Sequence, residues 1–429
     1  LDPDIIKKTQ ETFIQLYKDG FVYRGTRLVN WCIKHQTAFS DLEVKYIEKK
    51  DSLYYIKYGP FVLATVRPET KFGDTAIAVN PKDKRYKRYI GKEIVAEDVL
   101  GPIKLKVIAD EAVDPEFGTG VIKVTPAHDP TDFEIGLRHK LEVRQVIDKF
   151  GRLNEKTDSY QGLKIPEARE KVAGDLKKKG LLEKTDENYL HSVAVCYKCE
   201  TPLEPLLLPQ WFVKTTPLAK RAIEVVEKGK IQFVPARFKK IYLHWLKNIR
   251  DWNISRQIIW GIRIPAWYRD EKIYVGVKPP GGQGWKQDPD VFDTWFSSGQ
   301  WPFLTLGYPQ GKDYKKFYPT DVMAPGYEIL FFWVARMTML GLYLTKRVPF
   351  KTVYLHGMVR DKDRQKMSKS KGNVIDPLGI AELYGVDAIR MALVTGTASG
   401  NDPVISEDKI RGYRNFTTKI WNASRFVIS

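Results

Sequence analysis

Cysteine is scarce in this chain, since its 429 residues contain only three. Three thiols cannot build a disulfide framework, and such scarcity is typical of a reducing compartment, so we expect a cytoplasmic location. Long uncharged apolar runs are also lacking. The longest apolar stretch, residues 326–344, contains Glu328 and Arg336, which would be costly in a bilayer. The sequence therefore predicts a core helix there and no membrane span.

Acidic residues are outnumbered by basic ones, 52 to 70, which gives a net charge of +18. Such an excess indicates either a polyanionic partner, with nucleic acid the natural candidate, or a strongly solvated surface. The hydrophobic fraction of 43%, with 11 Trp, 22 Tyr and 20 Phe, is sufficient for two or three packed domains.

The spacing of apolar residues changes along the chain and predicts an α/β protein with a β-rich insertion. A helical pattern covers residues 4–20 and ends at Gly20, a residue suited to a C-terminal cap. Short β-branched and aromatic runs then predict strands, a helical pattern follows, and alternation of helices and strands from residue 212 onward suggests a parallel sheet. The expected strands are 53–58, 61–65, 94–96, 104–109, 121–125, 321–324 and 352–355, and the later helices are 165–179 and 415–427.

Two short motifs have the spacing of zinc ligands. Cys32 and His35 form one pair with two intervening residues, and Cys196 and Cys199 form the other. Three Cys and one His are a full tetrahedral set for structural zinc. The wide separation of the pairs makes sense only if the insertion leaves and re-enters at neighbouring strands. The alternative is that the first pair packs in a core and the second is a redox or vestigial motif.

A basic segment follows His356 and Gly357. Six Lys and Arg residues between Arg360 and Lys371 are interleaved with two serines and followed by Gly372. Point charges, hydroxyl donors and backbone freedom together suit a clamp for a polyphosphate, although a charge run can also be a solvated loop.

Residues 366–370 spell KMSKS, and with the following KGNVIDP they resemble the branched-chain subgroup of the class I aminoacyl-tRNA synthetases. The resemblance implies activation of an amino acid by ATP and Mg²⁺ to an aminoacyl-adenylate, with Lys366 and Lys369 as the catalytic lysines that stabilise the developing phosphate charge. By the same resemblance, the ATP-binding residues are Gly326, Glu328, His356, Gly357, Lys366, Ser368 and Lys369.

Three strings between residues 67 and 130 are rich in polar residues and turns: RPET at 67–70, GDTAIAV at 73–79 and GTGVIKVTPAHDP at 118–130. By chemistry alone, His128, Asp129 and Asp132 could be metal ligands or turn-forming residues. The strings resemble the editing domain of the valyl-type members of the family, which implies hydrolysis of threonine misattached to tRNA(Val) without a metal. The resemblance makes Asp129 the anchor of the α-amino group. It places the remaining editing residues around the pocket: Arg67, Thr70, Lys123, Thr125 and Asp132.

Two tryptophans stand in strings that resemble the amino-acid site of the valyl-type enzymes. A tryptophan is a core residue by default, but the resemblance implies that Trp260 and Trp295 wall the apolar pocket for L-valine. The segment 413–426 resembles the start of a helical anticodon-binding region. The expected partners are tRNA(Val), L-valine and ATP, and we expect a monomer without a membrane partner.

The resemblance implies a Rossmann-type nucleotide-binding catalytic domain interrupted by an editing domain. We expect catalytic-domain residues with the first half of the zinc knuckle at 1–50 and the editing domain at 51–190. The second half of the knuckle with a return strand then covers 191–213, the second half of the Rossmann domain 214–378, and the start of the helical region 379–429.

The HIGH signature of the ATP site is expected upstream of Leu1, and most of the anticodon-binding domain downstream of Ser429. We therefore expect a fragment that cannot activate valine alone. The alternatives are an isoleucyl-type synthetase, a standalone tRNA-binding or deacylating module, and a generic basic RNA-binding protein. The strings VTPAHDP, HGMVRD and RPET favour the valyl type over the isoleucyl type, and the KMSKS segment argues against the standalone module.

Overall fold

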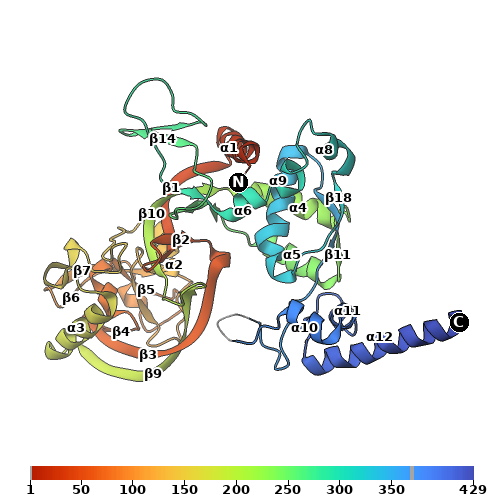
Figure 1. Cartoon of the computed structure of the whole chain (residues 1–429). Helices are drawn as coiled ribbons and strands as arrows, with labels where there is room; N and C mark the ends of the chain where they lie inside the picture. Colours follow the sequence, from red (N-terminus) through yellow and green to blue (C-terminus); the bar gives the residue numbers. More distant parts are fainter. Residues whose placement is uncertain (1, 368–371) are drawn as a thin grey trace. The chain divides into compact units, whose positions relative to one another are not determined.

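The structure is a computed structural model that describes residues 2–367 and 372–429. Its internal contacts divide the chain into two compact units (Figure 1). The β-rich unit contains Leu16–Val213 and Trp252–Asp293, and the parallel-sheet unit contains Leu1–Gln15, Lys214–Asp251 and Thr294–Ser429.

The β-rich unit is entered and left along two long paired strands. Strand β1 (Val22–Cys32) runs antiparallel to β10 (Glu204–Val213), from the pair Val22 and Val213 to the pair Trp31 and Glu204. Strands β2 (Thr37–Phe39) and β12 (Trp252–Asn253) complete this sheet in the order β12-β10-β1-β2. The chain therefore returns beside the strand by which it entered.

A second sheet consists of two longer, curved strands and a hairpin partner (Figure 1). Strand β3 (Val44–Tyr58) pairs antiparallel with β9 (Leu182–Cys196) and with β4 (Phe61–Thr65). The domain boundaries expected at 50/51 and 190/191 fall inside β3 and β9, which pair on both sides of a shift in register between Asp51 and Leu53. The contact division accordingly groups residues 16–50 and 191–213 with residues 51–190.

A third sheet, in the order β6-β7-β5-β8, lies between these strands in the sequence. Its strands are β5 (Ala76–Val79), β6 (Glu93–Ala96), β7 (Ile103–Ala109) and β8 (Val121–Val124). Two helices belong to the same region, α2 (Pro130–His139) and α3 (Ile165–Lys178). One apolar core joins this sheet to the other two and includes Trp31, Ile56, Leu63, Ile77, Val107 and Leu206.

The last part of the β-rich unit consists of short strands. Strand β13 (Ser255–Arg256) pairs with β17 (Val291–Phe292), and β14 (Ala266–Arg269) lies between β15 (Lys272–Val275) and β16 (Lys286–Gln287).

The parallel-sheet unit has a three-stranded sheet in the order β11-β19-β18, in which both pairings are parallel. The strands are β11 (Gln232–Val234), β18 (Thr320–Met323) and β19 (Phe350–Tyr354). Helix α5 (Arg237–Lys247) contacts β11, and α4 (Thr215–Glu227) packs against α5 and α9 (Ala335–Thr345). The parallel pairing predicted for this part of the chain is confirmed by the register of both strand pairs.

Short helices α6 (Thr294–Ser298), α7 (Trp301–Leu304) and α8 (Lys312–Phe317) precede β18. After β19, α10 (Pro377–Tyr384), α11 (Val386–Val394) and α12 (Glu407–Ile428) form the helical end of the chain. Helix α10 begins at Asp376, whose carboxylate accepts from the backbone N–H groups of Leu378 and Gly379, and α12 begins similarly at Ser406.

One helical stretch among the described residues, Tyr327–Thr345, is long and apolar enough to cross a membrane, and 61% of its most apolar window is buried. It contains α9, which packs against α4 and α7. The burial fits the core helix expected from the sequence.

Most predicted elements occur within one to three residues of their expected ends. Helix α1 (Pro3–Lys18) ends just before Gly20, whose φ of +74° is the left-handed cap conformation. The strand predicted over 53–58 is the end of the much longer β3, because the polar residues before Leu53 lie on its exposed part.

Replacement of Leu63 by alanine tests the common core of the β-rich unit. Leu63 lies in β4 with no exposed surface. Leu63→Ala should lower the free energy of unfolding by about 3 kcal/mol, because it leaves a cavity. Urea unfolding of the β-rich unit measures the change, and Leu190→Ala, at a half-exposed site on β9, should change it by less than about 0.5 kcal/mol. Equal effects would contradict the assignment of this core.

Candidate functional site

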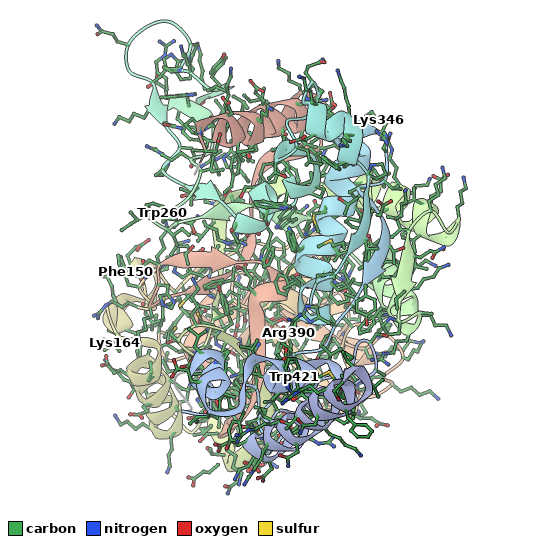
Figure 2. The ribbon with its side chains drawn as sticks, turned by 45° about the vertical axis from the view of Figure 1, so that its right-hand side comes forward. Phe150, Lys164, Trp260, Lys346, Arg390 and Trp421 are labelled. Carbon is green, nitrogen blue, oxygen red and sulfur yellow. The ribbon has the colours of Figure 1, made fainter. Side chains whose placement is uncertain are left out.

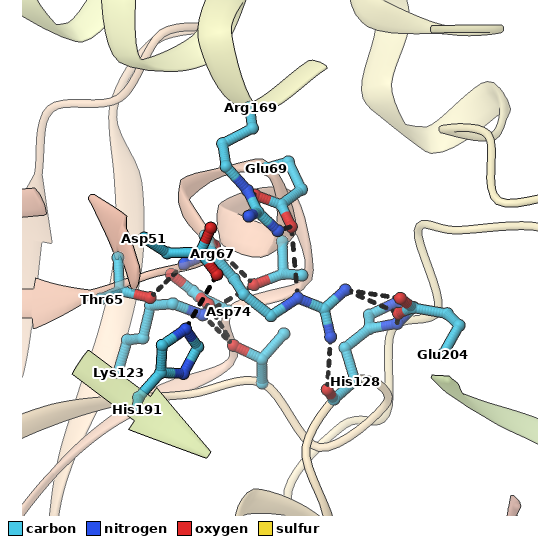
Figure 3. Close-up of polar contacts among 12 residues, drawn as sticks. Asp51, Thr65, Arg67, Glu69, Asp74, Lys123, His128, Arg169, His191 and Glu204 are labelled. Carbon is cyan, nitrogen blue, oxygen red and sulfur yellow. Dashed lines mark hydrogen bonds and ion pairs between the residues drawn. The ribbon is translucent and has the colours of Figure 1, made fainter. Parts of the chain in front are cut away.

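The first candidate site is a buried polar cluster in the β-rich unit, centred on Lys123 of β8 (Figure 3). Lys123 Nζ donates to Thr70 Oγ1 at 2.9 Å, to Thr125 Oγ1 at 2.5 Å and to Asp74 Oδ1 at 3.1 Å. Thr125 Oγ1 in turn donates to Asp74 Oδ1 at 2.6 Å. The structure thus brings together three of the predicted editing residues around Asp74, which the sequence analysis did not single out.

Asp132, on the first turn of α2, joins this cluster through the backbone. Its Oδ2 accepts from the N–H of Thr125 at 2.8 Å. Burial, and then the neighbouring Asp129 carboxylate, raise the pKa of Asp132 to about 7. Near neutral pH this carboxyl group can therefore either hold or release a proton, as an acid–base group for hydrolysis must.

Asp129 caps the N-terminus of α2. Its Oδ1 accepts from the backbone N–H groups of Thr131 and Asp132 at 2.7 and 3.0 Å, and Pro130 follows at the first helical position. Asp129 is exposed, so a cationic group can reach its carboxylate. The turn-forming role left open for this residue is thereby established.

Arg67 lies at the centre of a second set of contacts in the same unit (Figure 3). Its guanidinium donates two hydrogen bonds to Glu204 at 2.7 and 2.8 Å and one to Glu69 at 3.2 Å. Arg169 of α3 also pairs with Glu69, at 2.8 and 3.0 Å. Because Glu69 and Glu204 are buried, these pairs fix the RPET turn to α3 and to the start of β10.

His128 is buried beside Glu204 and acts as a structural hydrogen-bonding group. Its Nε2 accepts from the N–H of Val146 at 2.9 Å, so the ring proton lies on Nδ1, which faces Glu204 at 3.2 Å. Burial lowers the pKa of His128, against the opposing effect of Glu204. His128 is therefore neutral near pH 7.

The four predicted zinc ligands converge within the β-rich unit. Their ligand atoms all lie within 4.8 Å of one another, with Nδ1 of His35 3.5 Å from the sulfurs of Cys32 and Cys196, and Cys32 Sγ 3.7 Å from Cys199 Sγ. The edges of a tetrahedral site with zinc bond lengths are about 3.5 Å for N···S and about 3.8 Å for S···S. Pairing of Val44 with Cys196 brings the two halves together. The residues therefore fit a tetrahedral zinc ion.

The thiols of this Cys/His cluster differ in acidity: burial opposes ionisation of Cys199, but hydrogen bonding with Thr201 lowers its pKa to about 7. Phe39 and Leu203 cover the cluster, and burial raises the pKa of the Cys32 thiol to about 11. Bound zinc would reverse this effect and hold the sulfur as thiolate. The Cys/His cluster is the one such group that the structure contains in residues 2–367 and 372–429, so His128, Asp129 and Asp132 form no comparable group there.

In the parallel-sheet unit, two of the predicted ATP-binding segments lie side by side. Gly326 and His356 form a parallel β-bridge, in which His356 N–H donates to the carbonyl of Pro325 at 3.1 Å. A Cβ on Gly357 would lie 1.9 Å from the carbonyl oxygen of Asn401, so only glycine fits there. Lys366 Nζ donates to Glu328 Oε2 at 2.9 Å. Ser368 and Lys369 lie outside the described residues.

The two tryptophans assigned to the amino-acid pocket differ in exposure. Trp260 lies at the surface of the β-rich unit with 81% of its area exposed (Figure 2). Trp295 belongs to the parallel-sheet unit and its ring lies 5.3 Å from that of Phe332. Their joint role in an amino-acid pocket stays a prediction.

The sequence analysis missed four charged residues that pair with or support the predicted editing residues. Glu69 and Asp74 stand inside the quoted strings RPET and GDTAIAV, where a carboxylate beside a predicted cation was the available signal. Glu204 and Arg169 lie outside every quoted string, more than 95 residues from their partners. Only the pairing of distant segments identifies them.

The model of the tRNA synthetases class I (I, L, M and V) matches residues 1–281 and 277–406, and the chain belongs to this family. The α/β fold with its interrupted nucleotide-binding domain is the fold of this family.

Relatives named valine–tRNA ligase are similar along the whole chain. The proteins from Symbiobacterium thermophilum, Petrotoga mobilis and Solibacter usitatus are 49%, 50% and 51% identical to it, and the chain covers 48%, 50% and 52% of them. The chain thus spans about half the length of these relatives. Among solved structures, methionyl-tRNA synthetase of Mycobacterium tuberculosis in complex with methionyl-adenylate aligns with a TM-score of 0.49 and 13% identity, over 96% of this chain and 50% of that one.

The raised pKa of Asp132 predicts a pH effect on stability. Because its pKa of about 7 in the fold exceeds the ordinary value of 3.8, the fold favours the protonated form, and this stability is lost as the pH rises toward and through 7. Asp132→Asn should reduce the loss of unfolding free energy between pH 5 and pH 8 by about 2 kcal/mol. Urea unfolding at both pH values measures this difference. Asp186→Asn, at an exposed carboxylate of the same unit, is the control, and an equal effect there would refute the prediction.

Proposed function

We propose that this chain belongs to an enzyme that ligates valine to tRNA(Val) and that the β-rich unit hydrolyses threonine misattached to that tRNA. Identity near 50% with valine–tRNA ligases over the entire chain supports the substrate. The observation that carries the editing assignment is the convergence of Thr70, Thr125 and Asp132 on Lys123 and its backbone neighbours.

The physical need for a second site follows from the shapes of the two amino acids. Valine and threonine are nearly isosteric, and an apolar pocket rejects the extra hydroxyl only weakly. A site that hydrogen-bonds the hydroxyl binds threonine more tightly than valine, because valine cannot make that bond. In the β-rich unit, the Asp132 carboxyl can make it, and the Thr70 and Thr125 hydroxyls, whose protons are donated to Arg67 O and Asp74, can still accept.

The proposed reaction is hydrolysis of an ester. Water attacks the carbonyl carbon, the bond to the ribose oxygen breaks, and the products are free threonine and tRNA with its terminal hydroxyl restored. Asp129 pairs with the α-ammonium of threonine. Asp132 accepts a proton from the attacking water and returns it to the ribose oxygen as the ester bond breaks, and the Lys123 ammonium stabilises negative charge on the carbonyl oxygen.

For valine activation, we propose that the segment from Gly326 to Lys369 binds ATP. The bridge between Gly326 and His356 supports a close approach of adenosine to backbone, and Glu328 offers acceptors for ribose hydroxyls. Lys366 and Lys369 would bind the phosphates together with Mg²⁺, which neutralises phosphate charge. In this role, ATP would separate Lys366 from its present partner, Glu328.

We also propose that Cys32, His35, Cys196 and Cys199 hold a structural zinc ion. The ion would link the start of the insertion to its end. It would take part in neither valine activation nor threonine deacylation. Three cysteines without disulfides support a reducing, cytoplasmic location, and we keep the expectation that the protein is a monomer.

Deacylation by the chain tests the editing assignment. Purified chain should release threonine from threonine-charged tRNA(Val) and leave valine-charged tRNA(Val) largely intact. Asp129→Asn preserves the oxygen that caps α2 but removes the charge, so it should slow threonine release at least about tenfold. Asp376→Asn, at the cap of α10, is the matched control. Equal rates in both variants, or no release by the unsubstituted chain, would contradict the proposal.

Metal analysis tests the zinc assignment. We expect one zinc ion per chain by mass spectrometry, and we expect its loss in Cys196→Ser with a fall in melting temperature of about 10 °C, because metal binding contributes to folding. His191→Ala, at a histidine paired with Asp51 and not with the Cys/His cluster, should retain the metal. A metal-free wild-type chain expressed with zinc in excess would refute the site.

A further inference from the structure

Lys71 is a buried cation that the editing reaction described above does not use. Its side chain has no exposed area, and its Nζ has no hydrogen-bond partner in the described part of the chain. The nearest carboxylate oxygen, Asp98 Oδ1, lies 3.5 Å away. Burial of an ammonium group without a hydrogen bond is strongly unfavourable and lowers the pKa of Lys71, an effect that the Asp98 and Asp74 carboxylates oppose. The position therefore requires a compensating interaction.

Two groups supply it, the Asp98 carboxylate and the ring of Tyr58. Lys71 Nζ lies 3.4 Å from the ring centroid, within the range of a cation–π contact. Tyr58 is itself fully buried, and its hydroxyl donates to Asp74 Oδ2 at 2.5 Å. Burial and the Asp74 carboxylate hold the pKa of Tyr58 well above its usual value, so the phenol keeps its proton and remains a donor.

Asp74 connects this pair to the editing cluster. Its Oδ2 accepts from Tyr58, and its Oδ1 accepts from Lys123 Nζ at 3.1 Å and from Thr125 Oγ1 at 2.6 Å. Both carboxylate oxygens of Asp74 are therefore held by hydrogen bonds. The contacts run without interruption from Lys71 through Tyr58 and Asp74 to Lys123.

We propose that Lys71 and Tyr58 are positioning residues for threonine deacylation, which act through Asp74 on the Lys123 ammonium and the Thr125 hydroxyl. A cation over the ring withdraws electron density from the phenol and strengthens its donated hydrogen bond. The strengthened bond keeps Asp74 in the orientation that directs Lys123 toward the substrate. Neither Lys71 nor Tyr58 touches the substrate. This assignment rests on the proposed editing function.

The β-rich unit contains a second Lys–Tyr–Asp set that serves as a control, matched in burial at the tyrosine but with an exposed lysine. Tyr160 is 4% exposed, its hydroxyl donates to Asp175 Oδ2 at 2.8 Å, and Lys171 Nζ lies 4.8 Å from its ring centroid. Asp175 pairs with Lys178 at the surface. The same three types of group thus occur in the same unit in a set of contacts that leads to the surface.

The test compares the substitutions Tyr58→Phe and Lys71→Met with Tyr160→Phe and Lys171→Met, in steady-state hydrolysis of threonine-charged tRNA(Val) by the full chain. We expect kcat to fall about tenfold in the first pair, because a charge-assisted contact that orients the Lys123 ammonium is lost. KM should stay within about twofold, since no tRNA contact changes. The control pair should keep the wild-type kcat.

Circular dichroism establishes that each variant is folded at the assay temperature. A kcat for Tyr58→Phe and Lys71→Met equal to that of the controls would overturn the assignment while leaving the proposed editing function intact. Unfolding of both variants, with both controls folded, would also overturn it in favour of a purely structural role. No hydrolysis by the unsubstituted chain would overturn the proposed function and this assignment together.

Discussion

The ion pairs of Arg67 with Glu69 and Glu204 determine the shape of the candidate editing site. Glu69 follows Arg67 in the RPET turn, whereas Glu204 begins the strand by which the chain leaves the insertion. Both carboxylates are buried, so loss of the guanidinium would leave charges without compensation, which is far more costly than any surface ion pair. Since Arg67 also donates to the carbonyl oxygen of His128, it fixes the turn that precedes α2 and hence the positions of Asp129 and Asp132.

Charge balance in the low-dielectric interior explains how the site can hold many ionisable groups. Lys123 forms an ion pair with Asp74, and Arg169 forms one with Glu69. Lys71 pairs with Asp98 and lies over the Tyr58 ring. Asp132 forms no ion pair within residues 2–367 and 372–429, and burial raises its pKa to about 7 against the effect of Lys123. The surrounding pairs therefore form a fixed frame around Asp132, whose raised pKa suits the proton acceptor that the proposed hydrolysis needs.

Local patterns were sufficient to predict much of the fold, because spacing of apolar residues reports on which face is buried. Strand β4 and helix α3 occur almost at their predicted ends, and the Cys/His cluster was predicted from two pairs of ligands. The continuity of β3 and β9 through polar stretches was not predictable, because hydrogen bonds between the two strands and not side-chain burial maintain it. Glu204 and Tyr58 were missed for a related reason: their roles depend on which distant residues the sheets bring beside them.

A crystal structure of the chain with a non-hydrolysable analogue of threonine joined to adenosine tests the central claim most directly. The account predicts that the analogue binds in the β-rich unit, with its ammonium beside Asp129, its carbonyl oxygen beside Lys123 and its hydroxyl in contact with the threonine side chains of the cluster. The corresponding valine analogue should bind more weakly, because it lacks the hydroxyl that makes this contact. Binding of the threonine analogue away from Lys123 and Asp129, or equal affinity for both analogues, would contradict the account.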